Sequence, residues 1–359
     1  MLSLSQMTEM KTLDETLALL QQLIRIPSLS REEKACADFL EQYLCERGQQ
    51  VNRCGNNLWC QAPGFDASRP TVLLNSHIDT VVPASSWTRQ PFEPLVEDGR
   101  LYGLGSNDAG ASVCCLLQTF LILSQKPQYY NLILGLSCEE EVTGTGGIET
   151  LMQELPPISL AIVGEPTGMR AAVAEKGLMV LDCVAHGQAG HAAHTTGVNA
   201  IYKAMKDIEW FRTASLPRVS ELLGPVKMTV TVIQAGSRHN IIPDTCSFTV
   251  DIRVNEQYRN EELCEYIKTQ VDCDVKARSY RLSSSGIDLE HPVVSRCRDL
   301  GLELYGSPTL SDQARMSCPS LKIGPGDSLR SHTADEYVCL DEISGGLRLY
   351  EALLDGLRL

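Results

Sequence analysis

Three apolar runs, each predicted to form a β-strand, end in histidine or acidic residues. The runs and the side chains that follow them are 71–75 with His77 and Asp79, 131–138 with Glu139, Glu140 and Glu141, and 160–163 with Glu165. Ligands bind at the carboxyl ends of the strands in an open α/β sheet. We therefore expect these side chains to gather at one edge of a sheet.

Two further residues of the same kinds lie elsewhere in the chain, Asp108 in a glycine-rich loop and His332 in an Arg-Ser-His-Thr segment. Histidine and carboxylate ligands without cysteine suit zinc, cobalt or manganese. A pair of metal ions also needs a bridging carboxylate, and together the ions can hold a water molecule and a carbonyl oxygen. Each residue alone has an ordinary alternative as a turn former or a solvated side chain. The prediction of a metal site therefore depends on their joint placement.

Helical periodicity and apolar runs alternate in the first half of the chain. Helices are predicted at 14–25, 32–47 and 110–124, the second ending at Gly48, and strands at 57–62, 71–75, 131–138 and 160–163. Apolar strands that alternate with helices are typical of a layered α/β domain with a mixed, mainly parallel sheet.

The pattern changes near Lys176 and returns near residue 280. Strands are predicted between these points at 177–185, 227–233, 247–254 and 273–281, with helices at 197–213 and 260–270. Two helices and four strands in this order predict a small inserted α+β module. The chain then continues with a helix at 291–304, a strand at 319–323 and a final helix at 340–357. The predicted domains are 1–175 with 281–359, and the inserted module at 176–280.

The composition is that of an ordinary globular protein, since 43% of the 359 residues are hydrophobic and 21% are charged. The net charge of −14 disfavours nucleic acid as a partner, because a phosphate backbone would be repelled. No apolar run approaches the roughly 18 residues that span a bilayer, so no membrane association is expected. No secretory signal is recognised, and the fourteen cysteines are scattered without C-x-x-C pairs. A cytoplasmic protein with reduced thiols is therefore expected.

The motifs taken together resemble one family. They are S-H-I-D-T after an apolar strand, then Asp108, an acidic E-E, V-G-E-P-T, and G-P-G-D-S followed by H-T-x-x-E-Y. In this order they look like the co-catalytic zinc aminoacylase and metallopeptidase family, which includes acetylornithine deacetylase and succinyl-diaminopimelate desuccinylase. The C-terminal motif is most similar to the acetylornithine and acetyl-lysine deacetylase branch. The resemblance implies a zinc-dependent exopeptidase-like α/β catalytic domain with an inserted ferredoxin-like α+β domain for dimerisation or as a lid.

The resemblance also implies a centre of two Zn²⁺ ions, for which Co²⁺ is a possible substitute. Its ligands would be His77, Asp108 and Glu165 for one ion and Asp108, Glu141 and His332 for the other, with Asp108 as the bridge. Asp79 would accept a hydrogen bond from His77 and fix its tautomer. Glu140 would be the general base. The three consecutive glutamates leave the register open by one residue, and Glu139 is matched to the leading acidic position of the family.

The inserted module carries further matches. His191, in Gly-Gln-Ala-Gly-His, resembles a family histidine that reaches the active site of the partner subunit and stabilises the oxyanion, with His194 as a competing candidate. This implies a homodimer. Asn240, Arg253 and Gly324 are the predicted substrate contacts. A guanidinium suits bidentate recognition of a carboxylate, although an ordinary salt bridge is the alternative for Arg253.

The sequence departs from the family pattern at two places. Relatives often have a Lys-Gly pair soon after the bridging aspartate, where this chain has Ala109-Gly110-Ala111-Ser112. The family also often has a cis peptide bond directly after that aspartate. The segment 310–315 (LSDQAR) lacks the usual Asp-x-Arg spacing, which leaves open how the far side of the substrate is recognised.

The expected reaction is removal of the acyl group from the α-nitrogen of an acyl amino acid. N-acetylornithine, and hence arginine biosynthesis, is the first choice, and N-succinylornithine, acyl-citrulline, acyl-lysine and dipeptides are the alternatives. A nucleotide-binding oxidoreductase is disfavoured, because the glycines of 103–110 do not have the G-x-G-x-x-G spacing. A serine hydrolase lacks its G-x-S-x-G motif. A catalytically inactive binding protein is disfavoured because all the ligands and Glu140 are present.

Overall fold

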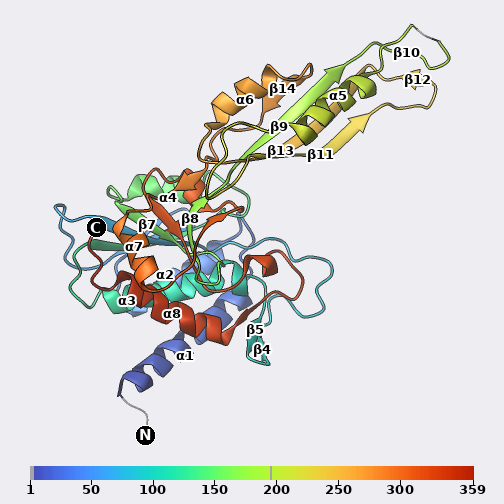
Figure 1. Ribbon diagram of the computed structural model, residues 1–359. Coiled ribbons are helices and arrows are strands. Elements are labelled where there is room, and N and C mark those ends of the chain that lie inside the picture. The colour runs from blue at the N-terminus through green and yellow to red at the C-terminus, as the bar shows by residue number, and fades with distance from the viewer. Residues whose placement is uncertain (1–3, 195) are drawn as a thin grey trace. The chain divides into compact units, whose positions relative to one another are not determined.

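The computed structural model describes residues 4–194 and 196–359. The chain forms two compact units (Figure 1). The first unit combines Met1–Val173, Gly286–Tyr305 and Ser311–Leu359, and the second combines Ala174–Ser285 and Gly306–Leu310. The short segment 306–310 joins the second unit, although no sequence pattern indicated it.

The main sheet has the strand order β1-β2-β6-β3-β7-β17-β8-β15, with β16 paired to β8. Its strands are β1 (Val51–Cys54), β2 (Asn57–Gln61), β3 (Thr71–His77), β6 (Asn131–Ser137), β7 (Leu160–Val163), β8 (Ala171–Glu175), β15 (Ser285–Gly286), β16 (Leu304–Ser307) and β17 (Ser320–Lys322). The central strands β6, β3, β7 and β17 are parallel. Antiparallel pairs flank them, β1 with β2, β2 with β6, and β17 with β8. The sheet is mixed as predicted, and its parallel part is the centre.

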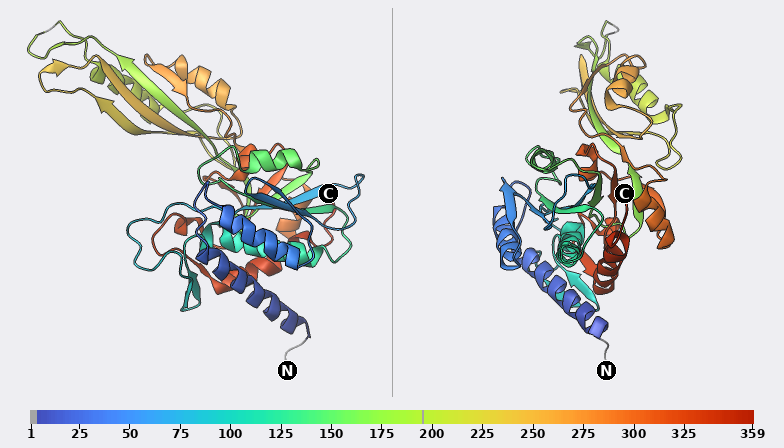
Figure 2. Two further views of the ribbon diagram at one scale, coloured as in Figure 1. Left: turned by 180° about the vertical axis from the view of Figure 1, so that it is seen from behind. Right: turned by 90° about the vertical axis from the view of Figure 1, so that its left-hand side faces the viewer.

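Side chains of β3 alternate between the two faces of this sheet. Val72 and Leu74 pack into the larger core, while Leu73 packs into a smaller cluster on the opposite face. The helices of the first unit are α1 (Leu4–Arg25), α2 (Lys34–Glu46), α3 (Ala111–Leu123), α4 (Ile148–Glu154), α7 (Pro292–Asp299) and α8 (Leu340–Leu354). Helix α3 packs on β3 and β6 and is flanked by α1 and α8, whereas α4 covers the other face (Figures 1 and 2). Helices therefore cover both faces, as an α/β sheet requires.

The helix that follows Asp108 corrects one expectation. The segment Ser106–Leu123 has the length and apolarity of a membrane span, but 78% of it is buried inside the protein. The expectation that no apolar run approaches this length is therefore wrong. Nearly every residue of α3 is buried in the core, which explains its apolar composition. A small sheet of β18 (Tyr337–Cys339), β5 (Arg100–Tyr102) and β4 (Leu95–Glu97) completes this unit.

The second unit contains a four-stranded antiparallel sheet of order β11-β13-β9-β14. Its elements are β9 (Gly177–His186), α5 (Ala200–Thr213), β11 (Lys227–Ala235), β13 (Thr245–Val254), α6 (Asn260–Lys268) and β14 (Asp274–Ala277). Alternate residues of β9 and β13 are buried in a separate core with α5 and α6. The predicted two helices and four strands are confirmed. A two-stranded ribbon of β10 (Gly190–His191) and β12 (Ile241–Ile242) lies outside this sheet.

Candidate metal centre

Two groups of ligand atoms lie at the carboxyl ends of the central strands. His77, Asp108 and Glu165 form one group, and Asp108, Glu141 and His332 form the other, with the ligand atoms of each group within 4.8 Å of one another. His77 ends β3, Glu141 follows β6 and Glu165 follows β7. The sequence predicted that His77, Glu141 and Glu165 gather at one edge of the sheet, and the structure brings them together there. Asp108 and His332, which lie in loops, join them in the first unit. Asp108 belongs to both groups, as a bridging carboxylate would.

The charges of this cluster fit divalent cations. Burial, together with the neighbouring Asp108, raises the pKa of Glu165 well above its usual value although His77 opposes the shift. Burial also raises the pKa of Glu140 far above normal, and Glu165 and Asp312 add to it. The two groups together contain three carboxylates and two histidines, and bound cations would offset the negative charge of the carboxylates. Histidine and oxygen donors without a thiolate suit a zinc-type ion, so this donor set fits a pair of such cations.

The imidazole of His77 is oriented through both ring nitrogens. Nε2 lies 3.2 Å from Asp108 Oδ1 and 3.8 Å from a Glu165 oxygen. Nδ1 lies 3.0 Å from the backbone carbonyl oxygen of Asp79 and 3.5 Å from its carboxylate. The closest partner of Nδ1 is therefore the main chain of Asp79, where the family pattern implies the side chain. A carbonyl can only accept, so Nδ1 carries the proton and Nε2 is directed to the metal ligands.

The carboxylate of Asp79 is instead directed to the loop after β6. Its two oxygens accept the backbone N–H groups of Glu140 at 3.0 Å and Glu141 at 3.1 Å. The hydroxyl of Ser30 donates a further bond at 2.7 Å. Burial opposes ionisation of Asp79, but His77 and these donors outweigh it and lower its pKa. Asp79 therefore remains an anion and fixes the backbone that carries Glu140 and Glu141.

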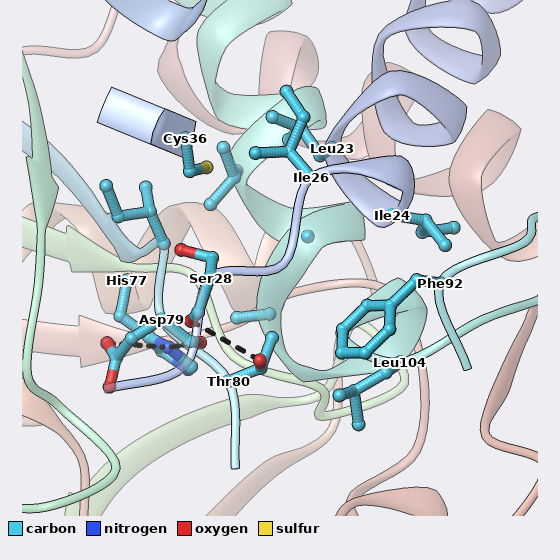
Figure 3. Close-up of a pocket in the computed structure, with 15 residues that line it drawn as sticks. Leu23, Ile24, Ile26, Ser28, Cys36, His77, Asp79, Thr80, Phe92 and Leu104 are labelled. Atoms are coloured by element: carbon cyan, nitrogen blue, oxygen red, sulfur yellow. Dashed lines mark hydrogen bonds and ion pairs between the residues drawn. The ribbon is translucent and has the colours of Figure 1, made fainter. Parts of the chain in front are cut away.

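A small cavity lies behind His77 and Asp79. Its volume is about 30 Å³, room for roughly one water molecule. Figure 3 shows that apolar side chains surround it, among them Ile24, Phe92 and Leu104. Thr80 closes one side by hydrogen bonds to the carbonyl oxygen of Ser28 (Figure 3). Hydrogen bonds are stronger in such largely apolar surroundings than in bulk water, and this applies to the bonds that orient His77.

The loop that carries Asp108 is held by Glu336, a residue to which the sequence assigned no role. The Glu336 carboxylate is buried and accepts the backbone N–H groups of Gly105, Asn107 and Asp108 at 2.8–3.0 Å. Burial and the nearby Asp108 raise its pKa to about 8. The peptide bond Asp108–Ala109 is cis, as the family pattern led us to expect. Glu336 stands in the H-T-x-x-E-Y motif, but no spacing in the sequence indicates that it binds this loop.

His332 and the glutamate run define the second group. His332 Nε2 lies 2.8 Å from Glu141 Oε2, and this contact raises the pKa of His332 to about 9. The backbone of His332 has a φ of 60°. Of the three glutamates, Glu141 lies in the cluster, while Glu139 turns back to the backbone N–H of Gly146. Glu140 lies between them, close enough to His77 and Glu165 to interact electrostatically.

Gly324 lies directly beside a metal-centre residue. A Cβ atom at this position would meet the backbone oxygen of Glu165 at 2.5 Å and the Ser112 hydroxyl at 2.4 Å. Its backbone N–H and C=O are both bonded to Thr167. The absence of a side chain at Gly324 thus allows the segment after β17 to approach the Glu165 segment closely.

The remaining predicted residues belong to the second unit. His191 is exposed, and its Nδ1 accepts the backbone N–H of Ala193 at 3.1 Å. The His194 ring lies 5.5 Å from that of His191. The ribbon of β10 and β12 brings Asn240 next to His191, since the carbonyl oxygen of Asn240 accepts the N–H of Ala192. Arg253 is bonded to Asp251 through two nitrogens, at 2.9 and 3.1 Å.

The profile of peptidase family M20/M25/M40 matches residues 73–356, which contain every residue of the metal centre. The chain belongs to this family. It is 29% identical over 356 residues to a peptidase M20 domain-containing protein of Schizosaccharomyces pombe, covering 95% of this chain and 84% of that protein. It is 26% identical over 354 residues to the succinyl-diaminopimelate desuccinylase of Corynebacterium glutamicum, covering 92% and 94%. As a member of this family, the chain is a hydrolase of the amidohydrolase or peptidase type.

Solved structures of the M20 family share the fold. A tripeptidase from Staphylococcus aureus aligns with a TM-score of 0.77 and 21% identity over 95% of this chain and 97% of its own. The Bacillus subtilis YxeP protein, described as a dinuclear metal-binding peptidase of the M20 family, aligns with a TM-score of 0.73 and 15% identity over 96% and 98%. At these identities the similarity establishes the fold of this chain.

Proposed function

We propose that this M20 hydrolase removes the Nα-acyl group from an acyl amino acid with a pair of zinc ions. The single observation that supports it most is the position of Asp108 in both ligand groups, because a shared carboxylate is what a two-metal centre requires. His77 and Glu165 complete one group, and Glu141 and His332 complete the other. Co²⁺ suits the same nitrogen and oxygen donors.

When bound, the two cations would polarise the amide carbonyl and make the attacking water more acidic. Glu140 is the residue of this chain that moves protons. Its side chain is half-buried and interacts electrostatically with His77 and Glu165 of one ligand group and with Glu141 of the other. It takes a proton from the attacking water and later delivers it to the leaving amine nitrogen, so that a carboxylate and a free amino acid are released. Asp79 holds the Glu140 backbone during these steps.

We propose N-acetylornithine as the first substrate to test. The C-terminal G-P-G-D-S and H-T-x-x-E-Y motifs support this choice, whereas relatives named succinyl-diaminopimelate desuccinylase support a succinyl group instead. N-succinylornithine, acyl-citrulline and acyl-lysine are therefore alternatives. Di- and tripeptides form a second class, favoured by the fold shared with the tripeptidase.

We propose a homodimer that assembles through the second unit. Strand β11 is an edge strand and exposes the hydrophobic residues Val232 and Ile233, while α5 exposes Tyr202 and Met205. Exposed apolar groups beside an unpaired strand edge favour association with a second copy. In the dimer, His191 of one subunit would stabilise the oxyanion in the other, and Asn240 would contact the substrate. Arg253 would have to exchange Asp251 for the substrate carboxylate.

The test is hydrolysis by the zinc-loaded protein, followed as free α-amine, with N-acetylornithine, N-succinylornithine and a dipeptide in parallel. A Glu140→Gln variant serves as the control. Cleavage of one acyl amino acid that is lost in the control supports the proposal and fixes the acyl group. Cleavage of the dipeptide alone would replace the deacylase by a peptidase, and failure to bind zinc would contradict the proposal.

A further inference from the structure

The short 3-10 helix η2 (Asp312–Arg315) lies in the segment that departs from the family spacing. Both of its charged side chains are buried, with Asp312 4% exposed and the Arg315 side chain 4% exposed. Helix η2 packs against α4 and β17, inside the first unit. Buried charges need partners, and the partners of these two residues lie at opposite ends of the loop 138–146, which we name the acidic loop.

Arg315 binds the far end of the acidic loop. Its guanidinium donates to the backbone carbonyl oxygens of Thr143 and Gly144. Its Nε lies 3.4 Å from the carboxylate of Glu149, in α4. A guanidinium offers five N–H donors in a fixed plane, so one side chain can hold two consecutive carbonyls and a carboxylate together.

Asp312 binds the near end. Its Oδ2 accepts the hydroxyl hydrogen of Ser137 at 2.6 Å, and Ser137 is the last residue of β6 before the acidic loop. Asn75 donates to the same hydroxyl oxygen at 3.0 Å. The carbonyl oxygen of Ser137 accepts the N–H of Ile78 at 2.8 Å. These bonds connect Asp312 to the end of β3, where His77 lies.

The middle of η2 is itself fixed to the sheet. Gln313 is fully buried and donates to the Ser320 hydroxyl of β17 at 2.8 Å. The acidic loop, in contrast, has two residues in the left-handed backbone region, Glu139 with φ 56° and Thr143 with φ 47°. Such a conformation persists only when surrounding contacts hold it. Helix η2 supplies one such contact directly, the bond from Arg315 to the carbonyl oxygen of Thr143.

We infer that Asp312 and Arg315 are positioning residues that hold the acidic loop so that Glu140 and Glu141 reach the metal centre. This inference depends on the proposed function, because the loop carries its general base and one of its ligands. It also resolves the open question about 310–315: Arg315 is engaged with protein carbonyls, so it is not the group that binds a substrate carboxylate.

The test compares Arg315→Met and Arg315→Lys with the unchanged protein by calorimetric titration with Co²⁺ alone and by the absorption spectrum of bound Co²⁺. The matched control is Arg296→Met, since Arg296 also donates to two backbone carbonyls, those of Ala352 and Asp355, far from Glu141 in the sequence and in no ligand group. We expect Arg315→Met to weaken binding of one of the two cations by about 10- to 100-fold and change the spectrum. Arg315→Lys should restore part of the loss, and Arg296→Met should leave both cations bound as before.

Steady-state kinetics of Arg315→Met distinguish a positioning role of Arg315 from direct binding of substrate. A lower kcat with KM unchanged supports the positioning role, whereas an unchanged kcat and unchanged cation binding with a raised KM would show that Arg315 binds substrate. If Arg315→Met does not fold, Asp312→Asn tests the other end of η2 with the same titration, and unchanged cation binding there would overturn the inference. If the unchanged protein binds two cations but cleaves no acyl substrate, the proposed function is contradicted. The Co²⁺ titration then still tests the role of η2.

Discussion

The carboxylate of Asp79 lies against the backbone of Glu140, whose N–H it accepts at 3.0 Å. The other oxygen accepts the N–H of Glu141 at 3.1 Å, so one anion fixes both residues of the acidic loop that serve the centre. Because the backbone of Asp79 also accepts from His77, a single residue connects the ligand at the end of β3 to the base after β6.

Replacement of this anion should therefore reduce activity without unfolding the protein. In Asp79→Asn an amide NH₂ would face one of the two backbone N–H groups. We expect kcat or zinc affinity to fall by about 10- to 100-fold. Activity assays would measure kcat, and zinc titration would measure the zinc affinity. Asp66→Asn is the control, since the Asp66 carboxylate accepts the backbone N–H of Ser68 on the surface. Full activity in Asp79→Asn would contradict this role.

Glu140 should be needed for chemistry and dispensable for metal binding. Glu140→Gln keeps the shape of the side chain but removes its capacity to accept a proton, so kcat should fall by about 100- to 10,000-fold. Zinc content measured by atomic absorption should stay at two per chain in this variant. Loss of a zinc ion in Glu140→Gln, with activity kept in Glu141→Gln, would mean that the register of the two residues is reversed.

Glu336 should stabilise the loop that carries Asp108. Glu336→Gln places an NH₂ group against backbone N–H donors, which leaves buried donors unsatisfied and costs about 1–3 kcal/mol. Urea denaturation of the metal-free protein would measure the change. Glu351→Gln is the control, because Glu351 forms a surface ion pair with Lys126 and should change stability little. Equal effects of the two substitutions would exclude a special role for Glu336.

The pH dependence of stability should involve Glu342, at the start of α8. Burial opposes ionisation of this carboxyl, but Arg330 outweighs it through two hydrogen bonds and lowers the pKa below its usual 4.5. A carboxyl with a lowered folded pKa stabilises the fold above its unfolded pKa, and this contribution disappears as the pH falls through the folded value. The stability difference between the unchanged protein and Glu342→Gln should thus be largest near pH 7 and vanish in acid. A difference independent of pH would contradict this assignment.

The proposed exchange of His191 between subunits can be tested by mixing two inactive variants, His191→Ala and Glu140→Ala. In a mixed dimer, one site has an intact Glu140 and receives the intact His191 of the partner subunit. Random mixing should therefore restore about a quarter of the normal activity. Val232→Lys with Ile233→Lys, at the edge of β11, should give monomers in sedimentation and no restoration. Activity restored by mixing the monomeric variants would exclude a role for His191 across the interface. The absence of restored activity in mixed dimers would exclude it as well.

Most elements were predictable because their patterns are local. The apolar run 131–138 and the periodicity of 110–124 correspond to β6 and α3, since burial of a face requires a matching repeat in the sequence. Some short elements were not predicted, for example β5 and η2, because no continuous apolar run marks them as it marks β7. Their conformations depend on partners distant in the chain, as β5 does on β18.

The sequence by itself indicated the candidate metal ligands, the family and the strands and helices of the inserted module, because motifs, strand ends and alternation are local patterns. The division of the ligands into two groups came from the resemblance to the family. The tertiary structure decided what orients them: that Asp79 holds the Glu140 backbone, that Glu336 holds the Asp108 loop, and that Arg315 holds Thr143 and Gly144. These contacts join residues up to 231 positions apart. Hydrogen bonds depend on distance and angle in space, and sequence spacing carries no information on either when the chain between the partners is folded.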